Sequence, residues 1–218
     1  MFKTRVLTAV IGIPVFLGVL YLGGWYWKLT FALIGILAFM EFIQMMSNIQ
    51  LRPLLLPGLL LLLLLLFSPD TYLYPGIFSM LILAVIISIL KYPDLTLKDT
   101  AISLFGAAYI GFLLSYAIKI ADLQQSFLVI VLALLLTWGS DTGAYFVGKS
   151  WGTHKMTPIL SPNKTWEGAI GGLVVSAVVA LVFFWVIDID GVGPAYALLL
   201  GLGASTLAQL GDFFISGV

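Results

Sequence analysis

Apolar runs separated by short polar turns make up most of this chain. A helix needs roughly 20 mostly apolar residues to cross a bilayer, and most of the runs approach that length. We therefore predict an all-α fold, a polytopic integral membrane helix bundle with about eight transmembrane helices. The predicted helices cover approximately 6–22, 27–46, 54–67, 74–90, 100–118, 126–148, 166–187 and 194–214.

The connections between these runs are short and carry turn residues, such as Gly23-Gly24 and Asp190-Gly191. The segment 149–165 differs because it is long, polar and basic. We predict two regions on this basis. They are an N-terminal region of about five transmembrane helices (1–125) and a catalytic-type transmembrane region with a cytosolic loop 149–165 (126–218).

The composition supports a membrane protein. Hydrophobic residues form 61% of the chain and charged residues only 9%, whereas soluble domains are about 25% charged. The ten basic and ten acidic residues balance, which argues against nucleic acid as a partner. Cysteine is absent from the sequence, so disulfides and thiolate metal sites are excluded.

The basic residues predict the orientation of the helices, because lysine and arginine are enriched in cytoplasmic loops. With the N-terminus in the cytosol and eight crossings, only Lys28 and Lys119 fall on the outer side. The others fall on the cytosolic side: Lys3, Arg5, Arg52, Lys91, Lys98, Lys149, Lys155 and Lys164. We expect a multi-pass protein of the cell inner (cytoplasmic) membrane.

Asp141 lies inside the predicted sixth helix. An ionisable group in a membrane span is costly and normally pairs, binds an ion or lines a watery cavity. Tyr145 and Gly148 follow at i+4 and i+7, on the same helix face. Asp141 is thus either part of a functional site or a structural carboxylate paired with a lysine of a neighbouring helix.

Asp212 belongs to a polar stripe on the predicted last helix. Ser205, Gln209, Asp212 and Ser216 are spaced 4, 3 and 4 residues apart, which places them on one face. The predicted topology brings Asp212 to the cytosolic side, as it does Asp141. Two carboxylates at one depth suit Mg²⁺, which takes one or two carboxylates plus substrate phosphates. The alternative for Asp212 is a solvated helix end.

A weaker polar stripe lies near the cytosolic end of the second helix. Glu41 is followed there by Gln44 and Asn48 at i+3 and i+7. Snorkelling or helix pairing explains this stripe as well as catalysis does, so Glu41 stays outside the predicted site.

The end of the segment 149–165 predicts a phosphate-binding helix start. Thr165 precedes the apolar seventh helix and is the expected N-cap. Free N–H groups at a helix start, beside Lys164 and hydroxyl groups, suit an anion such as phosphate. Glu167 either complements the helix dipole or binds a metal or substrate. His154, the only histidine, is interpreted as a surface residue rather than a catalytic base.

These features together suit phosphoryl or nucleotidyl transfer, where positioning and charge neutralisation supply most of the catalysis. A small transporter would also carry buried carboxylates, but at the bilayer midplane and with related halves. Here the polar groups lie towards one face, and no half-repeat is visible. A purely structural membrane subunit would not need the segment suited to phosphate.

Three segments resemble bacterial phosphatidate cytidylyltransferases, also called CDP-diacylglycerol synthases. They read SDTGAYFVGK over 140–149, SPNKTWEG over 161–168 and QLGD over 209–212. The resemblance implies that CTP and phosphatidic acid react to CDP-diacylglycerol and pyrophosphate, with Mg²⁺ as cofactor. It leaves open a second cation, a homodimer and, as the nearest alternative activity, a CTP-dependent polyprenol or lipid kinase.

The same resemblance implies roles for individual residues. Asp141, Lys164 and Asp212 are the expected catalytic residues, and Asp141 and Asp212 the expected metal ligands. The expected substrate-binding residues are Ser161, Asn163, Thr165, Glu167, Tyr145 and Gln209.

One departure from the resemblance concerns the end of the chain. Family members continue after the Gly-Asp segment into a further cytosolic stretch with basic and acidic signature residues, whereas this chain stops at Val218. We therefore expect a chain truncated at its C-terminus, inactive or severely impaired by itself.

Overall fold

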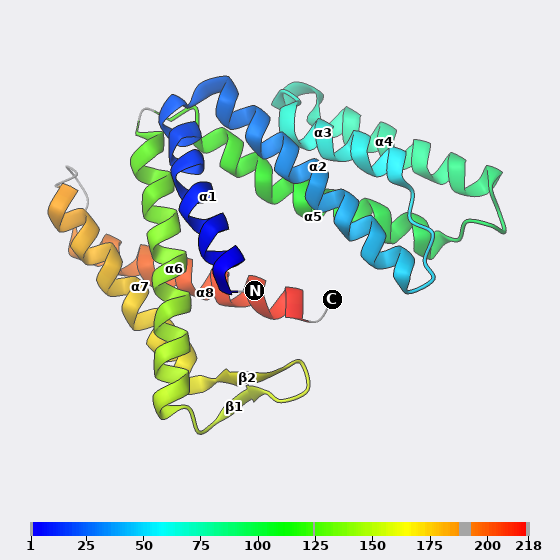
Figure 1. Cartoon of the computed structure of the whole chain (residues 1–218). Helices are drawn as coiled ribbons and strands as arrows, with labels where there is room; N and C mark the ends of the chain where they lie inside the picture. Colours follow the sequence, from blue (N-terminus) through cyan, green and yellow to red (C-terminus); the bar gives the residue numbers. More distant parts are fainter. Residues whose placement is uncertain (1, 124, 188–192, 217–218) are drawn as a thin grey trace. The chain divides into compact units, whose positions relative to one another are not determined.

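The computed structural model describes residues 2–123, 125–187 and 193–216. For residues 2–9, 11 and 13 of α1 only the backbone is described. The predicted turn at Asp190-Gly191 lies outside the described residues. The described chain folds into eight helices and one small hairpin (Figure 1). The helices are α1 (Phe2–Leu22), α2 (Gly24–Asn48), α3 (Leu55–Phe67), α4 (Asp70–Leu90), α5 (Leu97–Ile120), α6 (Ser126–Trp151), α7 (Trp166–Ile187) and α8 (Pro194–Ser216). The strands are β1 (Lys155–Thr157) and β2 (Ser161–Thr165).

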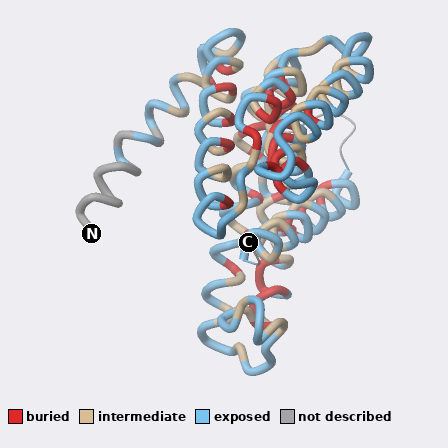
Figure 2. Tube along the Cα trace, turned by 90° about the vertical axis from the view of Figure 1, so that its right-hand side faces the viewer, coloured by how far each residue is buried: buried red, intermediate tan, exposed pale blue. Residues whose placement is uncertain are grey.

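The predicted all-α membrane bundle is confirmed. Six described helices, α2 and α4 to α8, are long and apolar enough to cross a membrane. Helix α3 is apolar but has only 13 residues, which corresponds to about 20 Å against a hydrocarbon thickness of about 30 Å. Figure 2 shows short buried stretches on helices that are otherwise exposed, as expected where lipid covers the outer faces.

The predicted helix boundaries are accurate to a few residues, and α5 shows why they differ. The sequence predicts a start near residue 100, but the helix begins at Leu97. Thr96 and Asp99 form a capping box, in which the Thr96 hydroxyl accepts from the Asp99 N–H and the Asp99 carboxylate accepts from the Thr96 N–H. This reciprocal pair satisfies two free N–H groups and sets the helix start.

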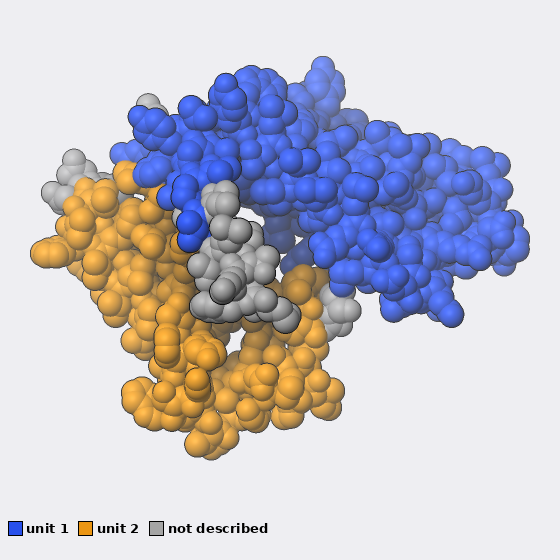
Figure 3. Space-filling model, in the orientation of Figure 1, with its two compact units in different colours: residues 1–127 blue, residues 128–218 orange. Residues whose placement is uncertain are grey.

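The chain divides into two compact units, residues 1–127 and 128–218 (Figure 3). Apolar side chains of α2, α3 and α5 form the core of the first unit. The Phe39 ring lies so close to Gly58 that a Cβ there would approach it to 2.2 Å, so the helix contact requires glycine. The buried core residues are Ala32, Phe39, Leu61, Leu62, Leu66, Ala107 and Ile118.

In the second unit, small residues let α7 and α8 approach closely. A Cβ on Gly201 of α8 would lie 2.7 Å from the Ser176 carbonyl oxygen of α7. The buried Ser176 hydroxyl in turn donates to the Gly201 carbonyl at 2.9 Å. A small apolar cluster, formed by Leu132, Leu136, Ala180 and Ala197, lies among α6, α7 and α8.

The predicted polar loop 149–165 is largely regular structure. Helix α6 continues to Trp151, and β1 and β2 form an antiparallel hairpin beyond the ends of α6 and α7 (Figure 1). Lys155 pairs with Thr165, and Thr157 with Ser161. The hairpin leads directly into α7, so strand β2 and the first turn of the helix are positioned together.

Candidate active site

A cleft of about 740 Å³ lies in the second unit, between the hairpin and the adjoining ends of α6, α7 and α8. Its charged side chains are three lysines and two aspartates. Such a set favours an anionic ligand. The polar and charged lining residues are Asp141, Tyr145, Lys149, Lys155, Ser161, Asn163, Lys164, Thr165, Gln209 and Asp212.

The three residues expected to be catalytic line this one cleft. Asp141 comes from α6, Lys164 from β2 and Asp212 from α8. Lys164 Nζ lies 2.6 Å from Asp212 Oδ2, which joins the hairpin to α8. The same ammonium lies 3.8 Å from the centroid of the Phe213 ring, a distance suited to a cation–π contact.

The Lys164 ammonium is buried at the cleft and has unused hydrogen-bonding capacity. Its side chain is 24% exposed, whereas that of Asp212 is 64% exposed. Apart from the ion pair with Asp212, Lys164 Nζ has no well-oriented hydrogen bond to any described residue. An anionic group that reaches Lys164 would therefore compete with Asp212 alone among the described acceptors for a charge-assisted bond.

A buried polar ladder connects the helices beneath the two aspartates. Ser140 of α6 and Ser205 of α8 are fully buried, and their hydroxyl oxygens lie 2.7 Å apart. Gln209 Nε2 donates to Ser205 Oγ at 3.0 Å and to the Ala169 carbonyl of α7 at 3.1 Å. Because Asp141 follows Ser140 directly and Asp212 lies one turn after Gln209, this ladder positions both carboxylates. Of the predicted polar stripe on α8, Ser205 is buried in this ladder and Gln209 and Asp212 line the cleft, whereas Ser216 is exposed and bonds to the Asp212 carbonyl of its own helix.

Gln209 has one hydrogen-bonding group left for the cleft. Both Nε2 hydrogens are used by Ser205 and Ala169. A carbonyl can only accept, so the Ala169 contact also determines which end of the amide is nitrogen. The remaining group, Oε1, can accept a hydrogen bond from a ligand hydroxyl or amino group in the cleft.

Strand β2 brings three of the six expected substrate-binding residues to the cleft. Ser161, Asn163 and Thr165 all line it. Thr165 is buried, and its hydroxyl accepts from the Gly168 N–H at 3.1 Å. This bond confirms Thr165 as the N-cap of α7 and places the start of that helix at the wall of the cleft.

Tyr145 and Lys149 come from one face of α6. Lys149 Nζ lies 3.5 Å from the Tyr145 hydroxyl, and both side chains are exposed at the cleft. Lys149 and Lys155 were missing from the predicted set of site residues. The signal that could have identified them is the concentration of basic residues in 149–165.

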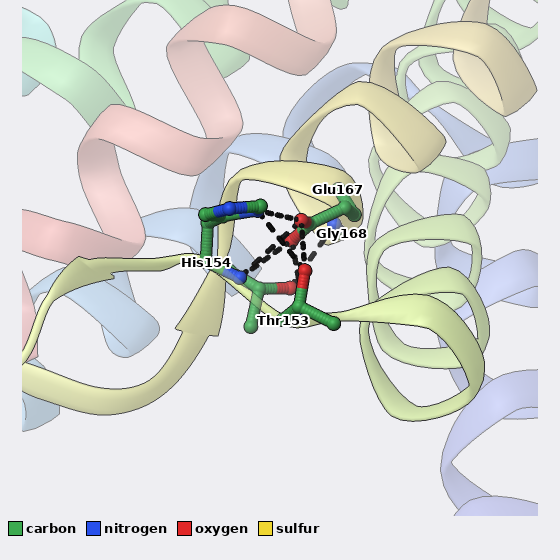
Figure 4. A network of polar contacts seen from close by, with 5 residues as sticks. Thr153, His154, Glu167 and Gly168 are labelled. Carbon is green, nitrogen blue, oxygen red and sulfur yellow. Dashed lines mark hydrogen bonds and ion pairs between the residues drawn. The ribbon is translucent and has the colours of Figure 1, made fainter.

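Glu167 lies beside the cleft and is absent from its described lining. Its Oε1 accepts from the Thr153 hydroxyl at 2.8 Å and lies 2.6 Å from His154 Nδ1. Its Oε2 accepts from the backbone N–H groups of Thr153 and His154, each at 3.2 Å (Figure 4). The carboxylate therefore fastens the start of the hairpin to the first turn of α7.

The residues present fit a magnesium ion that is completed by substrate. No group of three or more His, Cys, Asp or Glu side chains gathers anywhere in the described parts of the chain. Asp141 and Asp212 nevertheless line the same cleft, and Mg²⁺ is commonly held by one or two carboxylates, substrate phosphates and water.

Glu41, which the sequence analysis left outside the site, lies exposed on α2, within the first unit.

Comparisons with known proteins find similar sequences over nearly the whole chain. The model of the cytidylyltransferase family matches residues 3–218. A phosphatidate cytidylyltransferase of Bacillus subtilis is 36% identical to the chain over 228 aligned residues, covering 99% of the chain and 83% of the relative. Proteins of the same name from Staphylococcus haemolyticus and Staphylococcus aureus are 34% and 32% identical, and each is covered to 84%.

Proposed function

This chain belongs to the cytidylyltransferase family, and from that premise we propose that it transfers the cytidylyl group of CTP to phosphatidate. The products are CDP-diacylglycerol and pyrophosphate. The observation that carries the proposal is the joint presence of Asp141, Asp212 and Lys164 in one cleft at the ends of apolar helices. A lipid kinase and a transporter are not favoured, since the relatives share the name of a cytidylyltransferase.

The reaction requires no strong base. A phosphate oxygen of phosphatidate attacks the α-phosphorus of CTP, and the bond from that phosphorus to the oxygen bridging to the β-phosphorus breaks. The attacking phosphate is already anionic, so the protein mainly has to bring together and neutralise two anions. Lys149, Lys155 and Lys164 supply positive charge around the cleft for this task.

We propose that Lys164 transfers its contact from Asp212 to a substrate phosphate when the cleft is filled. The ion pair at 2.6 Å and the underlying Phe213 ring hold the ammonium at the cleft wall in advance. Asp141 and Asp212 would hold Mg²⁺, which supplies neutralisation of the triphosphate charge when bound. A second cation remains part of the proposal.

The remaining proposed contacts come from groups with free hydrogen-bonding capacity at the cleft. Ser161 and Asn163 on β2, with Tyr145 on α6, can contact the nucleotide or the lipid phosphate. Gln209 contributes an acceptor for a nucleotide hydroxyl or amino group. Thr165 and Glu167 act differently, by positioning the helix start and the hairpin.

We propose that residues 126–218 hold the transfer site and that the cleft lies on the cytosolic side of the inner (cytoplasmic) membrane. The excess of basic residues on that side in the predicted topology supports the orientation. A homodimer is also proposed, and the mass of the detergent-solubilised protein, measured by light scattering, tests it.

The test uses radiolabelled CTP and phosphatidic acid in detergent micelles with the intact protein. Asp141→Asn and Lys164→Ala should each abolish the formation of lipid-soluble label, whereas Lys28→Ala, at an exposed pair in the first unit, should retain it. Chelation of Mg²⁺ should stop turnover, and added Mg²⁺ should restore it. Unchanged turnover in either cleft variant would remove that residue from the site.

A further inference from the structure

The first unit contains a larger cavity of its own, of about 1380 Å³. It lies where the turn between α2 and α3 meets the end of α4. Its lining includes the charged residues Arg52, Lys91 and Asp94. Apolar residues also line it, among them Leu55, Ile87 and Leu95. The cavity therefore offers both charged and apolar groups to a ligand.

The ends of three candidate spans place this cavity at a membrane–water boundary. Helix α2 ends at Asn48, α4 ends at Leu90 and α5 begins at Leu97, and each of these helices is long and apolar enough to cross a bilayer. The cavity-lining connections 50–54 and 91–95 adjoin these ends. A cavity at the ends of such helices lies at the depth of lipid headgroups.

The turn that carries Arg52 is firmly held. The Arg52 N–H donates to the carboxylate of Asp99 at 2.6 Å, and Asp99 is only 4% exposed. The fully buried Ser103 hydroxyl donates to the carbonyl of Leu54, on the other side of Arg52. The backbone around Arg52 is thus fixed from both sides by buried groups of α5.

The positive groups at the cavity are only weakly neutralised. The Arg52 side chain is 69% exposed, and its Nη1 reaches Asp94 at 3.8 Å from the carboxylate and 3.4 Å from the backbone carbonyl. Lys91 makes no ion pair with any residue of the described ranges. Arginine and lysine together suit a phosphate, since both can form charge-assisted hydrogen bonds to its oxygens.

We propose that this cavity binds an acidic phospholipid, with its phosphate held by Arg52 and Lys91 and an acyl chain along Leu55 and Ile87. A basic pocket between membrane helices is suited to such headgroups. The cavity volume exceeds what a phosphate group alone would fill, and its apolar lining gives the lipid an advantage over a free phosphate. The site belongs to residues 1–127 and its occupancy does not depend on the transfer reaction.

Native mass spectrometry of the chain in a neutral detergent tests the proposal. The protein is titrated with phosphatidylglycerol, which is anionic, and with phosphatidylcholine of the same acyl chains, which is zwitterionic. We expect retention of phosphatidylglycerol to exceed that of phosphatidylcholine by about tenfold, as two charge-assisted contacts warrant. Equal retention of the two lipids overturns the proposal.

Variants then locate the preference. The double variant Arg52→Gln/Lys91→Gln should lose it, whereas Lys28→Gln/Lys119→Gln, which removes the same charge from the other end of the first unit, should keep it. The charge-retaining pair Arg52→Lys/Lys91→Arg should also keep it. A preference that survives the first variant, or is lost in the charge-retaining pair, contradicts the assignment.

A soluble competitor separates a lipid site from a phosphate site. Glycerol 3-phosphate carries the phosphate without acyl chains, so it should not displace bound phosphatidylglycerol at equal concentration. If glycerol 3-phosphate displaces bound phosphatidylglycerol as effectively as added phosphatidylglycerol of a different acyl mass does, the lipid assignment is overturned. This arm uses the unaltered chain, so it decides the question even if the double variant does not fold.

Discussion

The two units of the chain use buried polar side chains for different purposes. In the first unit, Asp99 and Ser103 lie near one end of α5 and bind the backbone of the turn that contains Arg52 and Leu54. In the second unit, Ser140, Ser205 and Gln209 lie within helices and bind one another across α6, α7 and α8. The first arrangement holds a turn, and the second holds helices around a cleft.

The apolar contacts differ in the same way. Large side chains such as Phe39 and Leu62 fill the centre of the first unit, whereas glycine, alanine and serine bring α7 and α8 together in the second. Lipid is as apolar as leucine, so helix association in a membrane depends on close packing and polar contacts. Small residues and a polar ladder give the second unit the fixed geometry that a reaction site requires.

The largest expected effect separates a carboxylate of the cleft from a carboxylate outside it. Asp212→Asn should lower cytidylyl transfer by roughly a hundredfold or more, because it removes a proposed metal ligand and the partner of Lys164. Asp122→Asn in the first unit breaks a partly exposed pair with Lys28, outside the cleft, and should change turnover by less than about twofold. Equal losses in the two variants, measured with radiolabelled CTP, would contradict the division of roles.

A second prediction compares two buried serines. Ser205→Ala leaves the Ser140 hydroxyl without its partner and removes one acceptor of Gln209, which should cost about 1–3 kcal/mol and lower the melting temperature in detergent. Ser115→Ala in the first unit removes only a bond to the Phe112 carbonyl of its own helix. Its effect should be smaller than that of Ser205→Ala.

Activity distinguishes the two serine variants further. Ser205 lies beneath the proposed metal ligands, so Ser205→Ala should lower turnover by about tenfold through misplaced carboxylates. Ser115→Ala should leave turnover unchanged. A Ser205→Ala protein with a lowered melting temperature and full turnover would limit the ladder to a structural role.

The sequence was sufficient to predict the helices and many of the residues that share the cleft. Apolar runs identify membrane spans because the bilayer sets their length. Successive spans end on alternate sides of the membrane, and together with the helical period this indicated that Asp141 and Asp212 lie at the same depth in the membrane. Both line the cleft. Their chemical roles remain predictions.

The contacts that refine the site could not be predicted from the sequence. The pairing of Lys164 with Asp212 and Phe213 depends on how a hairpin folds against the end of α8. The hairpin itself was missed, because 149–165 carries glycine, proline and charge without an alternating apolar pattern. The partners of Glu167 could not be predicted either, because Thr153 and His154 come near it only when the hairpin reverses the chain.

A third prediction concerns this fastening of the hairpin. Glu167→Gln removes the charge and leaves one acceptor oxygen in place of two, so it should weaken the bonds to Thr153 and His154. We expect a rise in KM for CTP of about threefold with little change in kcat, as for a loss of ground-state binding. Steady-state kinetics at varied CTP concentration measures it.

The matched control for Glu167→Gln lies on the same hairpin. Thr157 has a buried hydroxyl without a hydrogen-bond partner among the described residues. Thr157→Val keeps the shape of the side chain and removes only this hydroxyl, so KM should stay unchanged. A similar rise in KM in both variants would show that the hairpin responds to any substitution.

The smallest expected effect belongs to the exposed ends of the first unit. Lys119 and Asp70 lie 3.3 Å apart, but their side chains are 59% and 85% exposed, so water and salt screen the pair. A double-mutant cycle of Lys119→Gln and Asp70→Asn should give a coupling below about 0.5 kcal/mol. A coupling above about 1 kcal/mol would mean that ion pairs, as well as apolar packing, hold the first unit together. A weak coupling would leave that task to the contacts of α2, α3 and α5, in contrast to the polar ladder of the second unit.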